Sequence, residues 1–198
     1  MVITEIKLQK RNKKRCSIFA DGHYLMSMGI ETLQRMNVKE GDQITETFYQ
    51  DILRTEEKRR IGERMARMLG YRDRTAKELK TRFARLGFDE GLVAEVVADY
   101  VASKVLDDER LVQSFIADYT NLNPRGNLYI KGQLLAKGIE RKVIDRYLNE
   151  RDERAVARRF LDKQTSRRRE LNRAKAYRLL ASRGFTPSVV SEVVGEEF

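Results

Sequence analysis

The sequence predicts a mainly α-helical protein: a tandem array of three three-helix units forming an elongated curved molecule, preceded by a small N-terminal β-hairpin segment. Two patterns carry this prediction: a helix–glycine–helix block that recurs three times, and a turn signal at Asp21-Gly22 between two β-prone runs. Charged residues make up 35% of the 198 residues and only two residues are proline, which favours a helix-rich protein. We expect segments at 1–47, 48–105, 106–150 and 151–198.

The helix–glycine–helix block is clearest from Leu79 to Val97, LKTRFARLGFDEGLVAEVV. Apolar residues follow one helix face before Gly87, and the period restarts after Phe88 on a second helix. Glycine suits the position just past a helix because it adopts a left-handed backbone without a Cβ clash. Gly138 and Gly184 carry apolar residues at the same offsets, and the three glycines are separated by 51 and 46 residues. This spacing is typical of helical repeat arrays and is favoured over chance similarity between amphipathic hairpins.

The first 47 residues show the alternation of β-strands and not the helical pattern of the repeats. Ile3–Leu8 and Cys16–Ala20 alternate apolar and polar residues, and Asp21-Gly22 then precedes His23-Tyr24-Leu25. An Asp-Gly pair between β-prone runs predicts a hairpin, because both turn positions need positive φ. Lys10–Arg15 reads as an exposed basic loop and Glu31–Met36 as a short helix. This segment is too short to bury much core by itself.

The remaining chain has helical periodicity throughout. A third helix is expected to pack across each hairpin, because two helices cannot enclose a core. The first of these helices contains the polar stretch Thr55–Arg60, where a break or an exposed turn is possible, and Gly70 closes it. The expected helices are Phe48–Leu69, Ala76–Leu86, Asp89–Val105, one carrying Leu111 to Tyr119, Leu128–Lys137, Arg141–Leu148, one beginning near Asp152, Arg173–Ser182 and Pro187–Val194.

Short polar residues mark the starts of several helices. Asp73 or Thr75 is the expected N-cap of the helix at Ala76, Asp107 or Asp108 that of the next unit, and Thr186 that of the last helix, which has Pro187 in its first turn. Thr165–Arg169 reads as a loop or a helix start. Gly195–Phe198 is expected to fray.

Composition limits the partners and the compartment. The net charge is +10 with a pI near 9.8, which favours an acidic partner such as nucleic acid or an assembly that carries it. No apolar run is long enough for a membrane span and the start lacks the features of a secretory signal. The single cysteine, Cys16, fits a reducing cytoplasm. We expect a cytoplasmic monomer without a membrane partner.

The residues of an active site are missing from the pattern. The only histidine is His23, expected in a strand, and no Cys/His cluster has metal-ligand spacing. There is no G-x-x-x-x-G-K-[ST] loop for a nucleotide. Asp107 and Asp108 are paired carboxylates, but adjacent acids at a helix start are more often caps. We expect no catalytic residue, cofactor or metal.

Several short motifs in order resemble the RecX family. They are Arg72-x-x-Thr75-x-x-Glu78-Leu79 before the first glycine, Leu106-Asp107-Asp108-x-Arg110, and Arg125-Gly126 leading to Ile130-x-x-Gln133-Leu134-x-x-Lys137-Gly138-Ile139. The resemblance covers about residues 60–194, and the N-terminal hairpin is similar to the extension of longer members. Departures are mild: Thr75 replaces the usual Ser, Gln133 the usual Glu, and Leu111-Val112 an aromatic and an alanine.

The resemblance implies a regulator of DNA repair, recombination and the SOS response that binds the RecA filament on single-stranded DNA. RecA polymerises on single-stranded DNA as a helical filament with a deep groove, and an array of helical units suits insertion along that groove. The expected effect is inhibition of the recombinase and of ATP hydrolysis.

Local charge selects the candidate contacts with the filament or DNA. Residues 151–198 hold 12 Lys/Arg against 7 Asp/Glu and residues 1–105 hold 21 against 16, whereas residues 106–150 hold 7 of each. The positive excess therefore sits in the two end segments, and a solvated charged face is the alternative reading for any one residue. The candidates are Lys10, Arg11, Lys13, Lys14, Arg15, Arg72, Arg125, Lys131, Lys137, Arg167, Arg168, Arg169, Arg173 and Lys175.

A rival class is a helical protein that binds DNA or RNA, without sequence preference, in the absence of RecA. Three-helix units with a tight turn before the last helix resemble helix-turn-helix modules. The last helices at Leu92–Val97 and Val189–Val194 lack the Arg, Asn or Gln set used to read bases. Only Arg141, Lys142 and Arg146 are suitable, which disfavours a helix-turn-helix regulator that reads bases and leaves sequence-nonspecific binding as the alternative.

Overall fold

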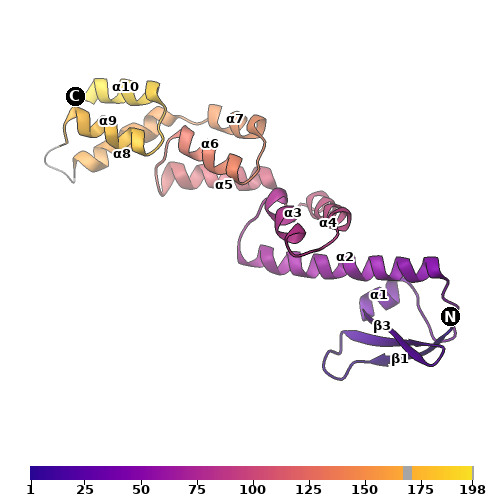
Figure 1. Ribbon diagram of the computed structural model, residues 1–198. Coiled ribbons are helices and arrows are strands. Elements are labelled where there is room, and N and C mark those ends of the chain that lie inside the picture. Colours follow the sequence, from indigo (N-terminus) through magenta and orange to yellow (C-terminus); the bar gives the residue numbers. More distant parts are fainter. Residues whose placement is uncertain (167–170, 198) are drawn as a thin grey trace. The chain divides into compact units, whose positions relative to one another are not determined.

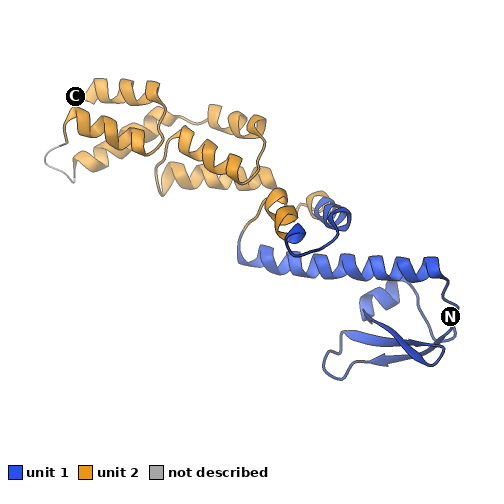
Figure 2. Ribbon diagram, viewed as in Figure 1, with its two compact units in different colours: residues 1–72, 83–99 blue, residues 73–82, 100–198 orange. Residues whose placement is uncertain are grey.

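The computed structural model describes residues 1–166 and 171–197 (Figure 1). Within these residues the chain forms three strands and ten helices, which confirms the mainly helical class and the β-containing N-terminal segment. The chain divides into two compact units, residues 1–72 with 83–99 and residues 73–82 with 100–198 (Figure 2). The division falls inside helix α3 (Ala76–Ala84).

The N-terminal sheet is antiparallel, in the order β1 (Ile3–Leu8), β2 (Arg15–Ala20), β3 (His23–Gly29). The predicted hairpin joins β2 to β3, and Asp21 and Gly22 have φ of +48° and +81°, as that tight turn requires. The basic loop joins β1 to β2, so the alternating run at Ile3–Leu8 adds a third strand to the hairpin.

The sheet, α1 (Ile30–Arg35) and the start of α2 (Glu46–Tyr71) share one core. In Figure 1, α1 lies between the sheet and α2. Because α2 supplies Ile52 to this core, the N-terminal segment buries its apolar face with help from the first long helix, as its small size requires. The buried members are Ile3, Cys16, Ile18, Met26, Met28, Val38, Ile44 and Ile52.

Helix α2 differs from its prediction. It runs without a break through Thr55–Arg60 and passes Gly70 to end at Tyr71. The polar stretch remains helical because the Glu56 carboxylate is buried in a network of hydrogen bonds instead of facing water. Helix α4 (Glu90–Ala102) begins close to its predicted start and ends three residues before the predicted Val105. Glu95 of α4 forms ion pairs with Arg54 and Lys58 of α2.

The second unit contains two complete three-helix modules, which we call the second and third repeats. The second repeat comprises α5 (Asp108–Asn121), α6 (Asn127–Ala136) and α7 (Arg141–Asn149). Its core contains residues of all three helices and the residue after the turn glycine: Val112, Ile130, Leu134, Ile139, Ile144 and Leu148.

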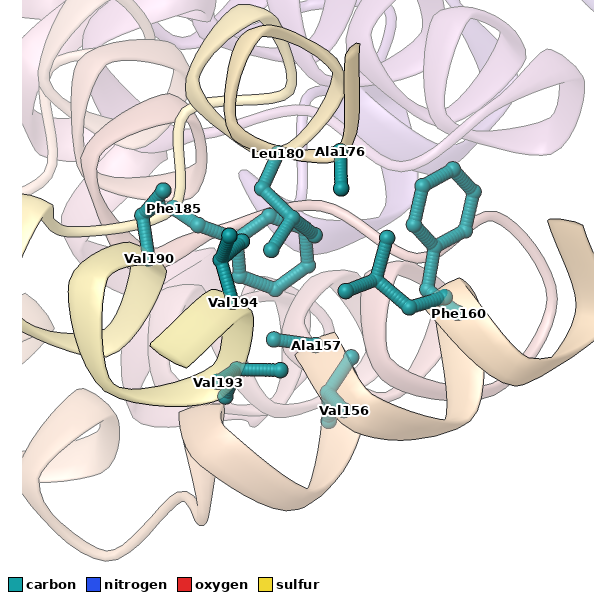
Figure 3. Close-up of a cluster of buried hydrophobic side chains, with 10 residues drawn as sticks. Val156, Ala157, Phe160, Ala176, Leu180, Phe185, Val190, Val193 and Val194 are labelled. Atoms are coloured by element: carbon teal, nitrogen blue, oxygen red, sulfur yellow. The ribbon is translucent and has the colours of Figure 1, made fainter. Parts of the chain in front are cut away.

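The third repeat comprises α8 (Glu153–Thr165), α9 (Arg173–Ser182) and α10 (Pro187–Glu197). Figure 3 shows its side chains pointing toward one another from the three helices, with Phe185 entering from the turn. Helix α10 continues to Glu197, so Gly195 lies within a helix where fraying was expected.

The predicted glycine stops are confirmed: Gly87, Gly138 and Gly184 have φ of +77°, +87° and +77°. The N-cap of α3 is Thr75, whose hydroxyl accepts from the Glu78 amide at 3.1 Å while the Glu78 carboxylate accepts from the Thr75 amide at 3.0 Å. Asp107 caps α5 and Asp152 caps α8. The Thr186 hydroxyl instead donates to the Glu153 carboxylate, because that buried acid faces the start of α10.

Among the described helices, none combines the length and the apolar character that a membrane span needs.

Candidate nucleic-acid interface

A carboxylate at the start of each long helix of the second unit binds the backbone of the preceding repeat. Asp108, the first residue of α5, accepts a hydrogen bond from the Ala76 amide at 3.2 Å. Glu153, the first residue of α8, accepts from the Asn127 amide at 2.6 Å. Ala76 and Asn127 begin α3 and α6, whose first amides have no partner within their own helix. We call these contacts between successive repeats joints: one is between α3 and α5, and the other is between α6 and α8. Both use the same chemistry at the same place in the repeat.

A second contact also recurs between successive repeats. The Thr75 hydroxyl donates to the Lys137 carbonyl at 2.7 Å, and the Gly126 amide donates to the Arg183 carbonyl at 3.1 Å. Lys137 and Arg183 directly precede the turn glycines of their repeats. The approach at Gly126 is close: an added Cβ would lie 2.0 Å from the Phe185 nitrogen. Only glycine fits there without moving one repeat away from the other.

The first unit contains a related joint. Glu56 of α2 accepts from the amide of Gly29, which precedes α1, at 3.1 Å and from the Thr32 hydroxyl at 3.0 Å. Arg15 and Arg59 donate to the same carboxylate at 2.6 and 2.7 Å. Burial by itself would raise the pKa of Glu56, but the hydrogen bonds from Arg59, Gly29 and Arg15 outweigh it and lower the pKa to about 2. Glu56 thus stays ionised and fixes α1 to α2.

Arg151 organises the connection between the second and third repeats. Its guanidinium donates to the Thr120 hydroxyl at 2.7 Å and to the Asn127 side-chain oxygen at 2.5 Å. It also donates to the carbonyls of Tyr119 and Arg125, at 3.3 and 2.7 Å. All four acceptors belong to the end of α5, the loop that follows it and the start of α6. Arg151 therefore holds this loop in one conformation from the start of the third repeat.

A cleft of about 320 Å³ opens beside that loop. One wall is the end of α5 and its loop, and the other comes from α8 and from Arg183 of the third repeat. Arg183 is fixed there, since its guanidinium lies 4.4 Å from the centre of the Phe160 ring and donates to the Pro124 carbonyl at 3.1 Å. The lining residues are Thr120, Asn121, Leu122, Asn123, Pro124, Arg159, Phe160, Lys163, Gln164 and Arg183.

The described charged residues of the cleft are all positive. Arg159, Lys163 and Arg183 line it, and no Asp or Glu is among the described lining residues. In the part of the chain that the structure describes, these three side chains make no ion pair with a carboxylate. Burial lowers the pKa of Arg183 and the neighbouring Arg125 lowers it further, as expected where cations gather without a counter-charge. The cleft is therefore suited to an anion.

Three of the predicted contact residues are engaged in internal ion pairs. Arg15 pairs with Glu56, Lys131 of α6 with Asp145 of α7, and Lys137 with Glu78 at 3.4 Å. A partner of these side chains would have to compete with carboxylates of the same chain. Arg125 lies at the joint, its guanidinium 4.6 Å from the centre of the Tyr129 ring.

Most other predicted residues are exposed. Lys10, Arg11, Lys13 and Lys14 lie together on the β1–β2 loop of the first unit. Arg72 is the C-cap of α2, and Arg173 and Lys175 lie in the first turn of α9. Arg167, Arg168 and Arg169 fall outside the described residues. The basic loop and the cleft belong to different units, so each stands as a separate candidate surface.

The sequence pattern did not single out Arg151, Arg159, Lys163 or Arg183. One signal was available for Arg183, which occupies the position before a repeat glycine that Lys137 also occupies. Nothing local distinguishes Arg151 or Arg159, because their partners lie at least 24 residues away, and Lys163 is one lysine among many exposed ones.

Fold and cleft together define a tandem helical-repeat protein with a cationic site at a joint between repeats. Comparison with known proteins identifies the family. The family model of the regulatory protein RecX N-terminal domain matches residues 1–45, and that of the RecX first three-helix domain matches residues 63–99. The chain belongs to the RecX family of regulatory proteins.

Individual relatives agree. The chain is 30% identical over 151 residues to a regulatory protein RecX of Clostridioides difficile (76% of this chain, 71% of the relative). It is 27% identical over 201 residues to that of Clostridium beijerinckii (97% and 93%). A crystal structure of regulatory protein RecX shares the fold with a TM-score of 0.78 at 23% identity over 98% of both chains. A RecX structure from Lactobacillus salivarius has a TM-score of 0.64 at 18% identity (72% of this chain, 97% of that chain). These relatives are named regulatory proteins and not enzymes.

Proposed function

We propose that this protein binds the RecA filament on single-stranded DNA and inhibits its recombinase and ATPase activities in the cytoplasm. Membership of the RecX family supports the regulatory role. The sequence motifs that resemble the family include residues of the joints described above, namely Thr75, Asp108, Gly126 and Lys137. Similar modules in series provide a repeated surface without a large core, which suits a partner with helical symmetry. In this role the protein lies in the filament groove, bridges neighbouring RecA protomers and hinders strand exchange or filament growth.

The cationic cleft is the observation that best supports this role. A filament of protein on DNA is an anionic partner, and a site whose described lining contains three cations and no carboxylate is suited to it. The exposed loop Lys10–Lys14 supplies a second positive surface from the first unit. Binding through such groups should weaken steeply as salt increases.

Titration of the protein into a RecA-dependent ATP hydrolysis assay on single-stranded DNA tests the proposal. We expect the hydrolysis rate to fall as the protein approaches RecA in concentration. An unchanged rate at stoichiometric or higher ratios would refute it.

The rival function, nucleic-acid binding without RecA, is separated by a second assay. A gel shift on random duplex DNA or on RNA would show strong binding if that reading were correct. Recovery of the protein with RecA only when single-stranded DNA is present favours the filament regulator.

A further inference from the structure

We propose that the cleft between the second and third repeats binds single-stranded DNA directly, with phosphates on Arg159 and Lys163 and an unpaired base against Leu122. The inference rests on the proposed function for the choice of DNA, since a protein acting on the RecA filament meets a single strand there. It adds a nucleic-acid site on this chain to the contact with RecA itself.

The charge of the cleft favours a phosphate over a neutral ligand. Arg159 and Lys163 lie one helical turn apart on α8, so both side chains reach the same side of the helix. Both residues are exposed, and Arg183 behind them is fixed against the Phe160 ring. Two exposed cations together with a fixed one can bind an irregular sugar–phosphate backbone, as the positively charged grooves of sequence-independent single-strand binders do.

The rest of the lining favours a single strand over a duplex. Leu122 lines the cleft and is 80% exposed, so it offers an apolar surface to a ligand there. The amides of Asn121 and Gln164 provide donors and acceptors beside it. Base faces and edges are available to such groups in a single strand, whereas a duplex presents mainly phosphates to a shallow site. A volume of about 320 Å³ is at the small end of ligand sites, suited to a nucleotide and not to a folded protein element.

The same features disfavour an acidic protein segment as the occupant. A carboxylate would pair with the cations but would make no favourable contact with the exposed leucine and the two side-chain amides. The loop that carries Leu122 is also fixed before any partner binds, because Arg151 binds the Tyr119 and Arg125 carbonyls on either side of it. A preformed wall reduces the ordering cost of binding a flexible strand.

The test measures binding of a fluorescent oligothymidylate in the absence of RecA, by anisotropy at several salt concentrations. A length of about 30 nucleotides exceeds the ~4–16 nucleotides that one such groove covers. The test variant is Arg159→Gln with Lys163→Gln. The matched control is Arg60→Gln with Arg67→Gln, which removes the same charge from exposed positions of α2.

We expect the test variant to bind the oligonucleotide at least about fivefold more weakly, whereas the control binds like the wild type. Loss of two phosphate contacts should also make the slope of log K against log salt less steep by about 1.4. A third variant, Leu122→Ser, should weaken binding without changing that slope. Circular dichroism should show the same helix content in all variants, since the altered side chains are exposed.

Two results would overturn the inference. One is equal oligonucleotide binding by the wild type and the test variant. The other is normal oligonucleotide binding by a test variant that no longer inhibits RecA, which would make the cleft a protein contact. Failure of the proposed function looks different: the wild type would bind the oligonucleotide through the cleft and leave RecA-dependent ATP hydrolysis unchanged.

Discussion

The Glu153 carboxylate accepts a hydrogen bond from the Asn127 backbone amide across the joint between the second and third repeats, at 2.6 Å. The same oxygen accepts from the Thr186 amide at 3.1 Å, and the other oxygen accepts from the Thr186 hydroxyl at 2.9 Å. One side chain, only 6% exposed, therefore joins the starts of α6, α8 and α10.

Replacing Glu153 by alanine should lower the free energy of unfolding by weakening the contact between the second and third repeats. The change leaves two backbone amides and a hydroxyl without their acceptor, which costs about 2–4 kcal/mol in total. Urea denaturation should show the loss, and hydrogen exchange should locate it by faster exchange of the Asn127 and Thr186 amides. Glu150→Ala, at an exposed position nearby, is the control and should stay within about 0.5 kcal/mol of wild type. Equal stability of both variants would contradict the role of this joint.

The low pKa of Glu56 predicts that the first unit loses stability in acid. The ionised carboxylate is favoured in the folded chain, with a pKa of about 2 against an ordinary value of 4.5. Its contribution, about 2–3 kcal/mol, is present above pH 4.5 and is lost as the pH falls from there toward 2.

Unfolding followed between pH 6 and pH 3 tests this expectation. Glu56→Gln should be less stable than wild type at pH 6, and the difference should shrink as the pH falls. A difference that stays constant over this range would show that the charge of Glu56 has no part in fixing α1 to α2.

Asp108, the acid at the joint between α3 and α5, should affect stability with the opposite pH dependence to Glu56. Burial raises the pKa of Asp108 above its ordinary 3.8, and although the Ala76 amide opposes this, Asp107 and Glu78 add to it. A raised folded-state pKa means that the ionised form costs stability, and that this cost disappears as the pH falls through the raised pKa toward 3.8. Asp108→Asn keeps an oxygen for the Ala76 amide and removes the charge.

At pH 7 this variant should therefore match the wild type in stability or exceed it by up to about 1 kcal/mol. Thermal unfolding measures the effect. A clear loss of stability would show that the charge at the helix start outweighs the burial of the carboxylate.

Two glycines of the second repeat should respond differently to the same change. A Cβ at Gly126 would lie 2.1 Å from the Gly184 oxygen, whereas one at Gly132, within α6, has no atom within 4 Å. Gly126→Ala should cost about 3 kcal/mol or more, or separate the repeats, because backbone atoms must move. Gly132→Ala should stabilise α6 by about 0.5–1 kcal/mol. Circular dichroism melts of the two variants give the comparison, and a tolerated Gly126→Ala would be incompatible with the close contact.

Features encoded by neighbouring residues could be predicted from the sequence. The turn glycines, the Asp21-Gly22 hairpin, and the caps at Thr75 and Asp107 each depend on a few consecutive residues, and the structure confirms them. The break or exposed turn that was possible at Thr55–Arg60 is absent from α2, and the partners that hold Glu56 there, Gly29 and Thr32, are distant in sequence.

The candidate site was harder to predict for the same reason. Charge density identifies basic runs, but the ion pair of Lys137 with Glu78 joins residues 59 positions apart, and the bond of Arg183 to the Pro124 carbonyl spans 59 as well. Packing of one repeat on the next decides which cations are neutralised and which remain available. That information is spread over two repeats and does not appear in any local pattern.

The joints have an evolutionary consequence. At each joint a carboxylate accepts a hydrogen bond from a main-chain amide. The bond is therefore the same although three different residue types supply the amide: Gly29, Ala76 and Asn127. A mutation on that side leaves the main-chain bond itself available as long as the helix still starts there, although Gly29 lies against Arg59 and the Asn127 side chain accepts a hydrogen bond from Arg151. Gene duplication could therefore lengthen such a chain by copying one module together with its acid, without first evolving a new side-chain interface.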